Sequence, residues 1–184
     1  MEKREFRRLV KERFKVISEE QKQSKSRAVV EQLRQILGQR QASVVALFAP
    51  MADEVRIGEL CNELAESGRC RVVLPRVVDM GPDAAMEFFD YMPSQMVEGA
   101  YGILEPQGEQ ACLVSDIDVM IVPGVAFDRT GGRLGRGKGY YDRYISREGF
   151  RAECIGVCYD FQLFDKLPTE QHDRVMDIVV ANNL

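Results

Sequence analysis

Cations and glycines gather in residues 119–144, which read VMIVPGVAFDRTGGRLGRGKGYYDRY. The segment begins as an apolar run, breaks at Pro123-Gly124 and resumes as a helical pattern from Tyr140. Between these parts lie five glycines and four cations: Gly131, Gly132, Gly135, Gly137, Gly139, Arg129, Arg133, Arg136 and Lys138. Glycines let backbone N–H groups turn inward, and a helix start adds partial positive charge. The order strand, cationic glycine loop, helix predicts a phosphate-binding site.

The glycine loop departs from two common nucleotide-binding patterns. Residues 132–139 match the P-loop pattern GxxxxGK, but Gly139 stands where that pattern needs a hydroxyl group to ligate Mg²⁺. Gly135, Gly137 and Gly139 follow GxGxG, whereas dinucleotide-binding folds use GxGxxG. We therefore expect charge-assisted hydrogen bonds from the cations to carry most of the phosphate affinity. A solvated surface loop is the alternative, which the buried strand directly before the loop disfavours.

Two carboxylates and the single histidine are candidates for metal binding or proton transfer. Asp142 lies three residues after Gly139, where it can either ligate Mg²⁺ beside bound phosphates or complement the helix dipole. Asp173 lies in a polar stretch before the last predicted strand. His172 can act as an acid or base, or form a structural hydrogen bond in a loop. The pattern alone leaves these alternatives open.

Three tyrosines follow the loop. Tyr140 and Tyr144 share a helical face, so we expect one of them to pack in the core. Tyr140 or Tyr141, at the end of the loop, can stack on a flat ring.

Two helices are predicted before the first strand. Residues 3–17 have apolar side chains at spacings of three and four and a cationic opposite face, which indicates an amphipathic helix. Ser18 and Gln21 form a capping-box pattern, so a second helix should begin there and end near Gly38.

The strands that position the loop are short apolar runs. Residues 43–49 and 70–74 predict two strands, with a helix between them that Asp53 would cap and Gly68 would end. Strand, helix and strand in this order favour a parallel pair. Further strands are expected at 85–92, 119–122, 152–159 and 178–181. A short helix capped by Ser94, a turn or extended segment at 102–106 and a helix at 140–147 complete the prediction.

These elements predict a three-layer α/β/α sandwich around a mixed, mostly parallel sheet of the Rossmann-like kind. No internal repeat or low-complexity linker interrupts the chain, so we expect a single domain over residues 1–184. A chain of 184 residues can bury roughly two-thirds of its unfolded surface in one core.

Composition excludes several classes of function. The net charge of −4 argues against a general nucleic-acid-binding protein. Five cysteines without a CxxC pair favour a reduced, cytoplasmic setting, and a single histidine disfavours a zinc site. The N-terminal segment is charged, so we expect neither a signal peptide nor a membrane span.

The motif GRLGRGKGYYDRY, preceded by VPGVAFD, resembles that of the 5-formyltetrahydrofolate cyclo-ligase family, also called methenyltetrahydrofolate synthetases. The likeness runs along the chain. It includes Lys3 and Arg7 in a KxxxR arrangement, the segment MADE at residues 51–54, and the pair His172-Asp173. The loop motif is long and specific, and the other segments strengthen it by their order.

The resemblance implies an ATP- and Mg²⁺-dependent conversion of 5-formyltetrahydrofolate to 5,10-methenyltetrahydrofolate, with ADP and phosphate released. The formyl oxygen would attack the γ-phosphate, and N10 would then close the ring. The expected partners are these two small molecules, without nucleic acid or membrane, and the protein is expected to be a monomer.

The resemblance also assigns site residues. Lys138, Arg136 and Arg133 would neutralise the transferred phosphoryl group. ATP would contact Lys3, Arg7, Arg133, Leu134, Gly135, Arg136, Gly137, Lys138, Gly139, Tyr140 and Tyr141. The folate would contact Ala49, Met51, Glu54, Tyr141 and the backbone of Gly135, Gly137 and Gly139. Asp142 and Asp173 would hold Mg²⁺, with Asp177 as the alternative to Asp173.

Two other functions stay open at this point. A non-catalytic nucleotide- or RNA-binding module would use the arginines, glycines and tyrosines of the loop to bind phosphates and stack bases. An ATP-dependent enzyme of the same fold could act on another amide or carboxylate.

Overall fold

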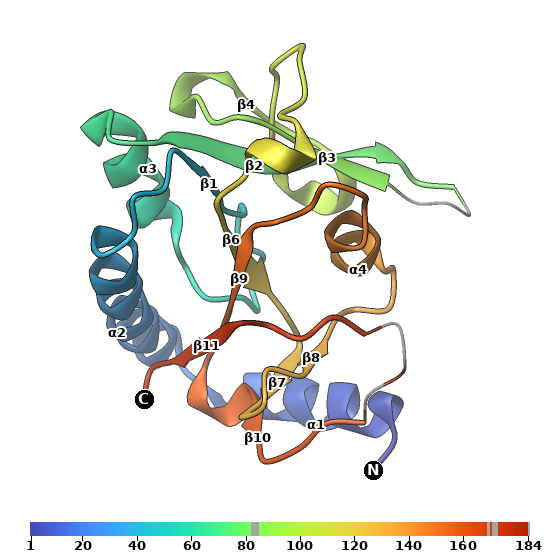
Figure 1. The fold of residues 1–184 in the computed structure, drawn as a ribbon. Helices are drawn as coiled ribbons and strands as arrows, with labels where there is room; N and C mark the ends of the chain where they lie inside the picture. Colours follow the sequence, from blue (N-terminus) through green and yellow to red (C-terminus); the bar gives the residue numbers. More distant parts are fainter. Residues whose placement is uncertain (82–84, 169, 171–172, 184) are drawn as a thin grey trace.

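A six-stranded sheet forms the middle layer of the protein, in the order β11-β9-β6-β1-β2-β3 (Figure 1). The computed structural model describes residues 1–81, 85–168, 170 and 173–183. The strands are β1 (Val44–Ala46), β2 (Arg71–Asp79), β3 (Ala85–Asp90), β6 (Val119–Pro123), β9 (Glu153–Cys158) and β11 (Ile178–Ala181). Neighbours pair in parallel except β2 and β3, which are antiparallel. The predicted mixed, mostly parallel sheet is confirmed.

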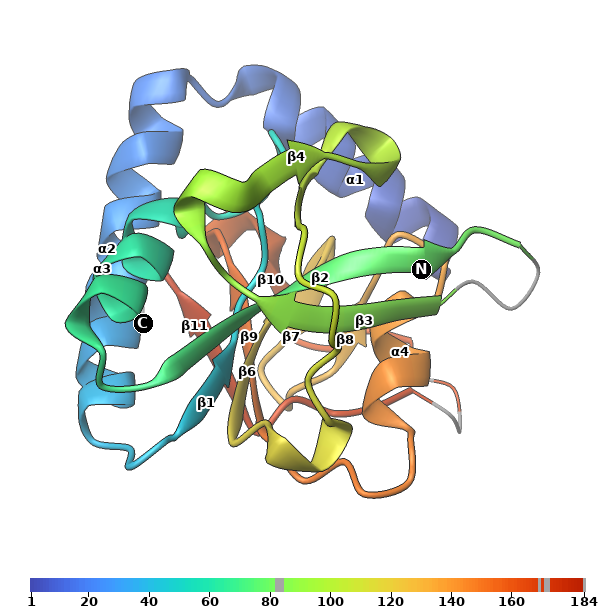
Figure 2. The ribbon, with the colours of Figure 1, turned by 90° about the horizontal axis from the view of Figure 1, so that it is seen from above.

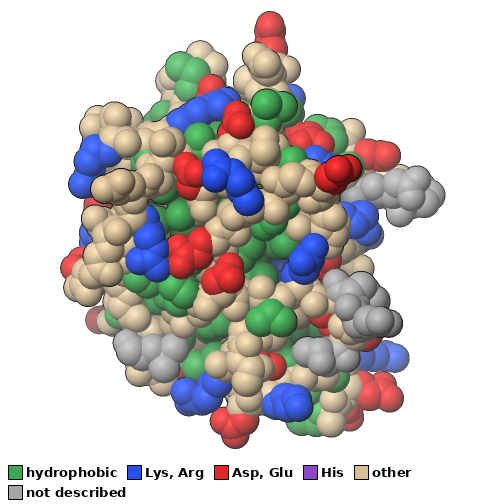
Figure 3. Space-filling model, viewed as in Figure 1, with side chains coloured by type: hydrophobic (Ala, Val, Ile, Leu, Met, Phe, Trp, Pro, Cys, Tyr) green, Lys and Arg blue, Asp and Glu red, His purple; other side chains and the backbone are tan. Residues whose placement is uncertain are grey.

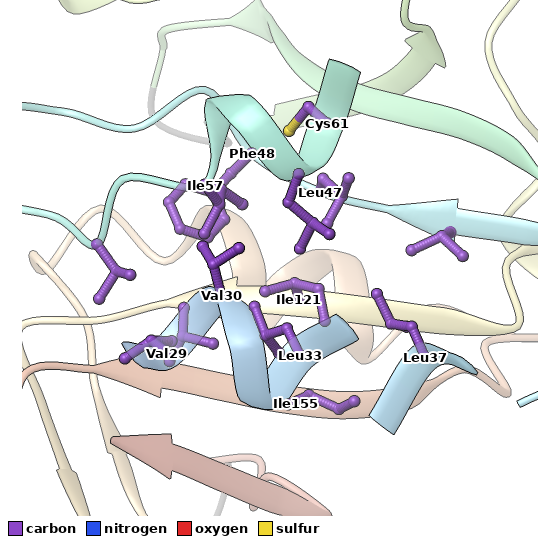
Figure 4. Close-up of a cluster of buried hydrophobic side chains, with 14 of the residues drawn as sticks. Val29, Val30, Leu33, Leu37, Leu47, Phe48, Ile57, Cys61, Ile121 and Ile155 are labelled. Atoms are coloured by element: carbon purple, nitrogen blue, oxygen red, sulfur yellow. The ribbon is translucent and has the colours of Figure 1, made fainter. Parts of the chain in front are cut away.

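Helices cover both faces of this sheet, as the view from above shows (Figure 2). The helices α2 (Glu19–Gly38) and α3 (Gly58–Ser67) pack on one face, where Val29, Val30 and Leu33 of α2 meet Ile121 and Ile155 of the sheet (Figure 4). The helix α4 (Tyr140–Ile145) packs on the other face. Successive residues of a strand point to opposite faces of the sheet, so a single strand contributes side chains to the hydrophobic cores on both faces. The three-layer prediction is confirmed.

Local signals placed the helix ends correctly in two cases. The Ser18 hydroxyl accepts the Gln21 N–H at 3.1 Å and the Gln21 side chain accepts the Ser18 N–H at 2.9 Å, so the capping box starts α2. Gly68 ends α3 in the left-handed conformation, with φ of 62°. The first helix, α1 (Lys3–Val16), buries Phe6 and Val10. No helix among the described residues is long and apolar enough to cross a membrane.

Three predicted helices differ from the structure. Asp53 does not cap α3, which begins at Gly58 with Ile57 as its N-cap; Asp53 pairs with Arg136 instead. Ser94 lies in a single 3₁₀ turn, and the chain then forms a hairpin of β4 (Met96–Glu98) and β5 (Leu104–Pro106). The helix after the glycine loop, α4, was predicted to extend to residue 147 but ends at Ile145.

Four 3₁₀ turns complete the described elements: η1 (Pro93–Gln95), η2 (Ala100–Gly102), η3 (Val114–Asp116) and η4 (Asp160–Gln162).

A second, three-stranded sheet interrupts the segment that was predicted as one loop. It consists of β7 (Ala126–Asp128), β8 (Arg133–Leu134) and β10 (Leu163–Phe164), and α1 packs beside it (Figure 1). Arg129 lies in the turn between β7 and β8 and is 3.6 Å from Asp165. The segment predicted as one loop is therefore divided, and Arg129 lies in a different turn from residues 135–139.

Candidate active site

A cavity of about 350 Å³ opens between the glycine loop, the carboxyl end of β1 and the β4–β5 hairpin. Its residues come from three parts of the chain. We call the first the loop wall: Pro123, Gly124, Arg133, Gly135, Arg136, Lys138, Gly139, Tyr140, Tyr141 and Asp142. The second, the hairpin wall, comprises Pro75, Val77, Met86, Tyr101, Ile103 and Glu105. The third, the β1 end, comprises Phe48, Ala49, Met51 and Glu54.

Eleven residues predicted as site residues line this cavity: Ala49, Met51, Glu54, Arg133, Gly135, Arg136, Lys138, Gly139, Tyr140, Tyr141 and Asp142. Five other predicted residues, all within the described chain, lie outside its lining: Lys3, Arg7, Leu134, Gly137 and Asp173. His172 lies outside the described residues.

The helix α1 contacts the loop from outside the cavity. The Arg7 Nε donates to the Gly135 carbonyl at 2.9 Å. One turn earlier, the Lys3 ammonium lies 2.7 Å from Asp173 and 3.0 Å from Glu170. Burial opposes the charge of Lys3, but these two carboxylates outweigh it and raise the pKa of Lys3. Lys3 and Arg7 thus bring the N-terminal helix, the loop and the C-terminal segment together.

Leu134 does not present its side chain to the cavity. Only 3% of this residue is exposed, and it packs with Phe6 and Val10 under α1. A contact between Leu134 and ATP therefore has to use the backbone.

Arg133 is fixed in the loop wall by three contacts. Its side chain is 6% exposed. The Nε donates to the Pro123 carbonyl at 2.9 Å, and one terminal nitrogen donates to Asp142 at 3.1 Å. Its guanidinium also lies 5.2 Å from the ring centre of Tyr141. Burial and the nearby charge of Glu54, with Arg133 opposing, raise the pKa of Tyr141, so the phenol stays protonated.

Arg136 joins the loop wall to the β1 end. Its guanidinium donates to both oxygens of Asp53, at 2.6 and 3.1 Å, and to Glu54 at 3.2 Å. The second oxygen of Glu54 accepts the Met51 N–H at 2.9 Å. Burial raises the pKa of Glu54, and these two contacts only partly oppose that effect. Asp53, predicted as a helix cap, instead sets the position of Arg136.

The glycines at the end of the loop adopt conformations that other residues avoid. Gly137 and Gly139 have φ of 97° and 71°. A Cβ atom at Gly139 would also lie 2.7 Å from the side chain of Arg143. Lys138, between the two glycines, is exposed at the cavity. Because α4 has only six residues, its dipole is small, and the cations provide most of the positive field.

The carboxylates predicted to bind metal lie on two segments. Asp142 lines the cavity with a side chain that is 34% exposed. Asp173 lies beside Lys3, whereas Asp177 accepts the Cys154 N–H at 2.7 Å between β9 and β11. Neither Asp173 nor Asp177 lies in the lining of the cavity. The described residues contain no group of three His, Cys, Asp or Glu side chains arranged for a metal. Mg²⁺ commonly takes one or two carboxylates together with substrate phosphates, so the donor chemistry is compatible.

Sequence reasoning missed the whole hairpin wall. Tyr101, at φ of 60°, has its hydroxyl 3.1 Å from that of Tyr140. Burial and this hydrogen bond raise the pKa of Tyr140 to about 12. Val77 and Glu105 meet across the cavity edge, where Glu105 accepts the Val77 N–H at 3.1 Å. An aromatic residue between two glycines, at residues 99–102, was the one usable signal in the sequence.

Tyr144 belongs to the core and not to the site. It is 1% exposed, and its ring centre lies 4.8 Å from that of Phe88. The prediction that one of the two face-sharing tyrosines packs in the core is confirmed.

Comparisons with known proteins point to one family. The family described as "5-formyltetrahydrofolate cyclo-ligase family" matches residues 1–182. A 5-formyltetrahydrofolate cyclo-ligase of Mycolicibacterium smegmatis is 35% identical over 141 residues, covering 74% of this chain and 72% of that protein. A protein of the same name from Escherichia coli K12 is 31% identical over 177 residues, covering 94% of this chain and 96% of its own.

A solved structure shares the fold. The NMR structure of Aquifex aeolicus 5,10-methenyltetrahydrofolate synthetase superposes with a TM-score of 0.86 and 33% identity, covering 100% of this chain and 91% of that one. The superposition therefore covers the whole of this chain.

Proposed function

Because the chain belongs to the 5-formyltetrahydrofolate cyclo-ligase family, a family of enzymes, we propose that it uses ATP to close 5-formyltetrahydrofolate to 5,10-methenyltetrahydrofolate. One observation carries the proposal. A single cavity has a cationic glycine loop on one wall and an apolar surface on the facing wall. Such a cavity can hold a phosphoryl donor and a flat ring in contact.

The proposed reaction begins with phosphorylation of the formyl oxygen. An amide oxygen is a poor nucleophile and a poor leaving group, so ring closure needs it converted to a phosphate ester. The formyl oxygen bonds to the γ-phosphorus as the bond to ADP breaks, leaving a phosphorylated iminium carbon. N10 then attacks that carbon and loses its proton, and the carbon–oxygen bond breaks to release phosphate.

Lys138, Arg133 and Arg136 are proposed to neutralise the phosphoryl group during transfer. Phosphoryl transfer depends on positioning and charge neutralisation more than on a covalent side chain. Arg133 is held in place by Pro123 and Asp142, so it needs little reorganisation. Lys138 is exposed at the cavity and can follow the phosphate as the bond breaks.

The rest of the nucleotide is proposed to lie along the loop toward α1. The backbone N–H groups of Gly135, Gly137 and Gly139 would cradle phosphate oxygens, with Lys3 and Arg7 reaching them from the helix. Arg7 already contacts the Gly135 carbonyl, which supports this placement. Tyr140 and Tyr141 would contact the nucleotide from the first turn of α4.

The reacting end of the folate is proposed to lie at the β1 end. Glu54, Ala49 and Met51 line the cavity there, and Tyr141 faces it from the loop wall. Glu54 is joined to Arg136, so the folate site and the phosphate site share an ion pair. A phosphate group that binds Arg136 would therefore change the hydrogen bonding of Glu54 beside the folate.

Asp142 and Asp173 are proposed to hold Mg²⁺, which when bound supplies charge neutralisation at the phosphates. Asp142 accepts a hydrogen bond from Arg133, which orients the carboxylate at the cavity. We expect Asp142→Asn to raise the Mg²⁺ concentration for half-maximal activity about 10-fold while leaving folate affinity nearly unchanged. If added Mg²⁺ restores nothing and only folate binding falls, Asp142 does not bind the metal.

We further propose that the enzyme acts as one domain, as a monomer and in the cytoplasm. The six-stranded sheet draws strands from both halves of the chain, which supports a single domain. Five free cysteines, four of them buried, suit a reducing compartment.

The direct test mixes the protein, MgATP and 5-formyltetrahydrofolate and follows the near-ultraviolet absorbance of the methenyl product. We expect absorbance to rise only when all components are present. Folded protein that produces no change contradicts the proposal. A salt-sensitive complex with single-stranded RNA would favour the binding-module alternative, although Lys and Arg are interspersed with Asp and Glu on the face in Figure 3.

A further inference from the structure

Glu105 is a buried carboxylate in the cavity wall without a cationic partner in the part of the chain that the structure describes. It is 7% exposed and lines the cavity beside Val77 and Ile103. Among the described residues, its carboxylate accepts one hydrogen bond, from the Val77 N–H at 3.1 Å. A buried carboxylate is costly unless paired or well hydrogen-bonded. Glu105 therefore has unused acceptor capacity in the wall of the cavity.

Two other buried carboxylates, Asp128 and Glu54, have several hydrogen-bond donors that offset the cost of burying their charge. Asp128 accepts the N–H groups of Thr130, Gly132 and Leu167 and the Thr130 hydroxyl, at 2.7–2.9 Å. Glu54 has both an arginine and a backbone N–H. Glu105 differs from Asp128 and Glu54, because its carboxylate has a single hydrogen-bond donor within the described chain. It also lines the cavity.

The hairpin is shaped around this carboxylate. Gly99 leaves the space that it fills, because a Cβ atom there would lie 2.0 Å from the Glu105 Oε2. The turn that follows places Tyr101 in a left-handed conformation, at φ of 60°, beside the cavity. Gly99 therefore leaves room for the Glu105 carboxylate, and the Val77 N–H gives one of its oxygens a fixed donor.

We infer that Glu105 recognises the pyrimidine edge of the folate pteridine ring, an inference that rests on the proposed function. This edge presents a ring N–H and an adjacent amino group, two parallel donors that a carboxylate can accept. Val77, Met86 and Ile103 offer an apolar surface for the flat ring next to it. N5 lies in the other ring of the pteridine, so anchoring this edge at the hairpin wall directs the formyl group toward the loop wall. Glu105 is thus a specificity-determining residue for the 2-amino edge of the pteridine ring.

The test pairs a protein change with a ligand change. Glu105→Gln keeps an acceptor for the Val77 N–H, and Glu98→Gln on the exposed strand β4 is the matched control. The ligands are 5-formyltetrahydrofolate and its analogue with a methyl group in place of the 2-amino group. Dissociation constants are measured by calorimetry without ATP, alongside the KM for ATP and the unfolding temperature.

We expect the wild type and the Glu98→Gln control to bind the methyl analogue roughly 10- to 100-fold more weakly than the natural folate. Glu105→Gln should bind the natural folate about 10-fold more weakly, and should distinguish the two ligands less than about threefold. The KM for ATP should not change. Equal losses for both ligands in Glu105→Gln would mean that Glu105 is only structural.

The wild-type protein alone can overturn the inference, even if the variant does not fold. Wild type that makes methenyl product but binds both ligands equally well would exclude recognition of the 2-amino group and leave the proposed function intact. Wild type that makes no product and binds neither folate would overturn the proposed function itself, and the inference with it.

Discussion

The loop wall and the hairpin wall meet in one cavity but are built in opposite ways. The cations Arg133 and Arg136 of the loop wall are held by ion pairs with Asp142, Asp53 and Glu54. The hairpin wall is apolar apart from Tyr101 and Glu105, and Glu105 has no ion pair within the described chain. Ion pairs can be exchanged for phosphate oxygens, whereas an apolar wall keeps its shape. This difference suits the loop wall to binding phosphate groups and the hairpin wall to holding a flat ring.

The largest predicted effect separates chemistry from folding on the loop wall. Lys138→Ala should lower kcat by about 10²- to 10³-fold, because it removes a charge that we propose acts on the transferred phosphoryl group. Its unfolding temperature should stay near that of the wild type, since Lys138 is exposed. Lys166→Ala, another exposed lysine, is the control and should keep full activity. Wild-type kcat in Lys138→Ala would remove Lys138 from the mechanism.

A second change tests whether α1 serves the loop wall. Arg7→Ala should raise the KM for ATP by roughly 10- to 100-fold, as expected for one lost charge-assisted hydrogen bond, and should leave folate affinity unchanged. Arg8 follows Arg7 but is exposed, so Arg8→Ala is the matched control. Steady-state kinetics with each substrate varied in turn measure both constants. A rise in the folate KM alone would contradict the assignment of ATP to the loop wall.

The hairpin wall should show the reverse selectivity with a smaller effect. Val77→Ala removes two methyl groups next to the proposed position of the ring, and because Val77 is half-buried we expect about a fivefold rise in the folate KM. The KM for ATP should not move. Val78, the next residue of β2, is exposed and absent from the cavity lining, so Val78→Ala is the control. Equal effects of the two variants on the folate KM would argue against a ring on this wall.

The smallest prediction concerns pH and the ion pair that links the loop wall to the β1 end. Burial raises the folded-state pKa of Glu54, so the folded protein holds this proton more tightly than the unfolded chain does. The contribution of Glu54 to the free energy of unfolding should therefore fall as pH rises from about 4.3, the ordinary glutamate value, through the raised pKa. Denaturant unfolding across this range measures it.

The control for that measurement is a substitution at an exposed glutamate of α3. Glu54→Gln should flatten the decline, and Glu59→Gln should leave it as in the wild type. A decline that is unchanged in Glu54→Gln would assign the pH dependence to another group.

Features that depend on neighbouring residues were predictable from the sequence. The capping box at Ser18, the end of α3 at Gly68 and the buried strands all rest on side chains a few positions apart. Most residues from Arg133 to Asp142 line the cavity and lie close together in the chain, so their shared position could be predicted, although Leu134 and Gly137 lie outside the lining. Their individual roles stay predictions.

Features that depend on distant partners were not predictable. Asp53 is a residue type that often caps helices, but in the structure it pairs with Arg136, which is 83 residues away in the chain. Strands β8 and β10 have two residues each, too few to show an alternating pattern. Glu105 becomes part of the cavity only because the hairpin folds against β2, where Val77 supplies an N–H group. Contacts of this kind appear only when the sheet has been assembled.

A structure of the protein with Mg²⁺, a non-hydrolysable ATP analogue and 5-formyltetrahydrofolate tests the division of the cavity most directly. We predict that the γ-phosphate lies against Lys138 and the loop glycines, with the pteridine ring on Val77, Ile103 and Glu105 and its formyl oxygen facing the phosphate. Phosphates on the hairpin wall, or a pteridine ring outside the cavity, would contradict the assignment of one wall to each substrate.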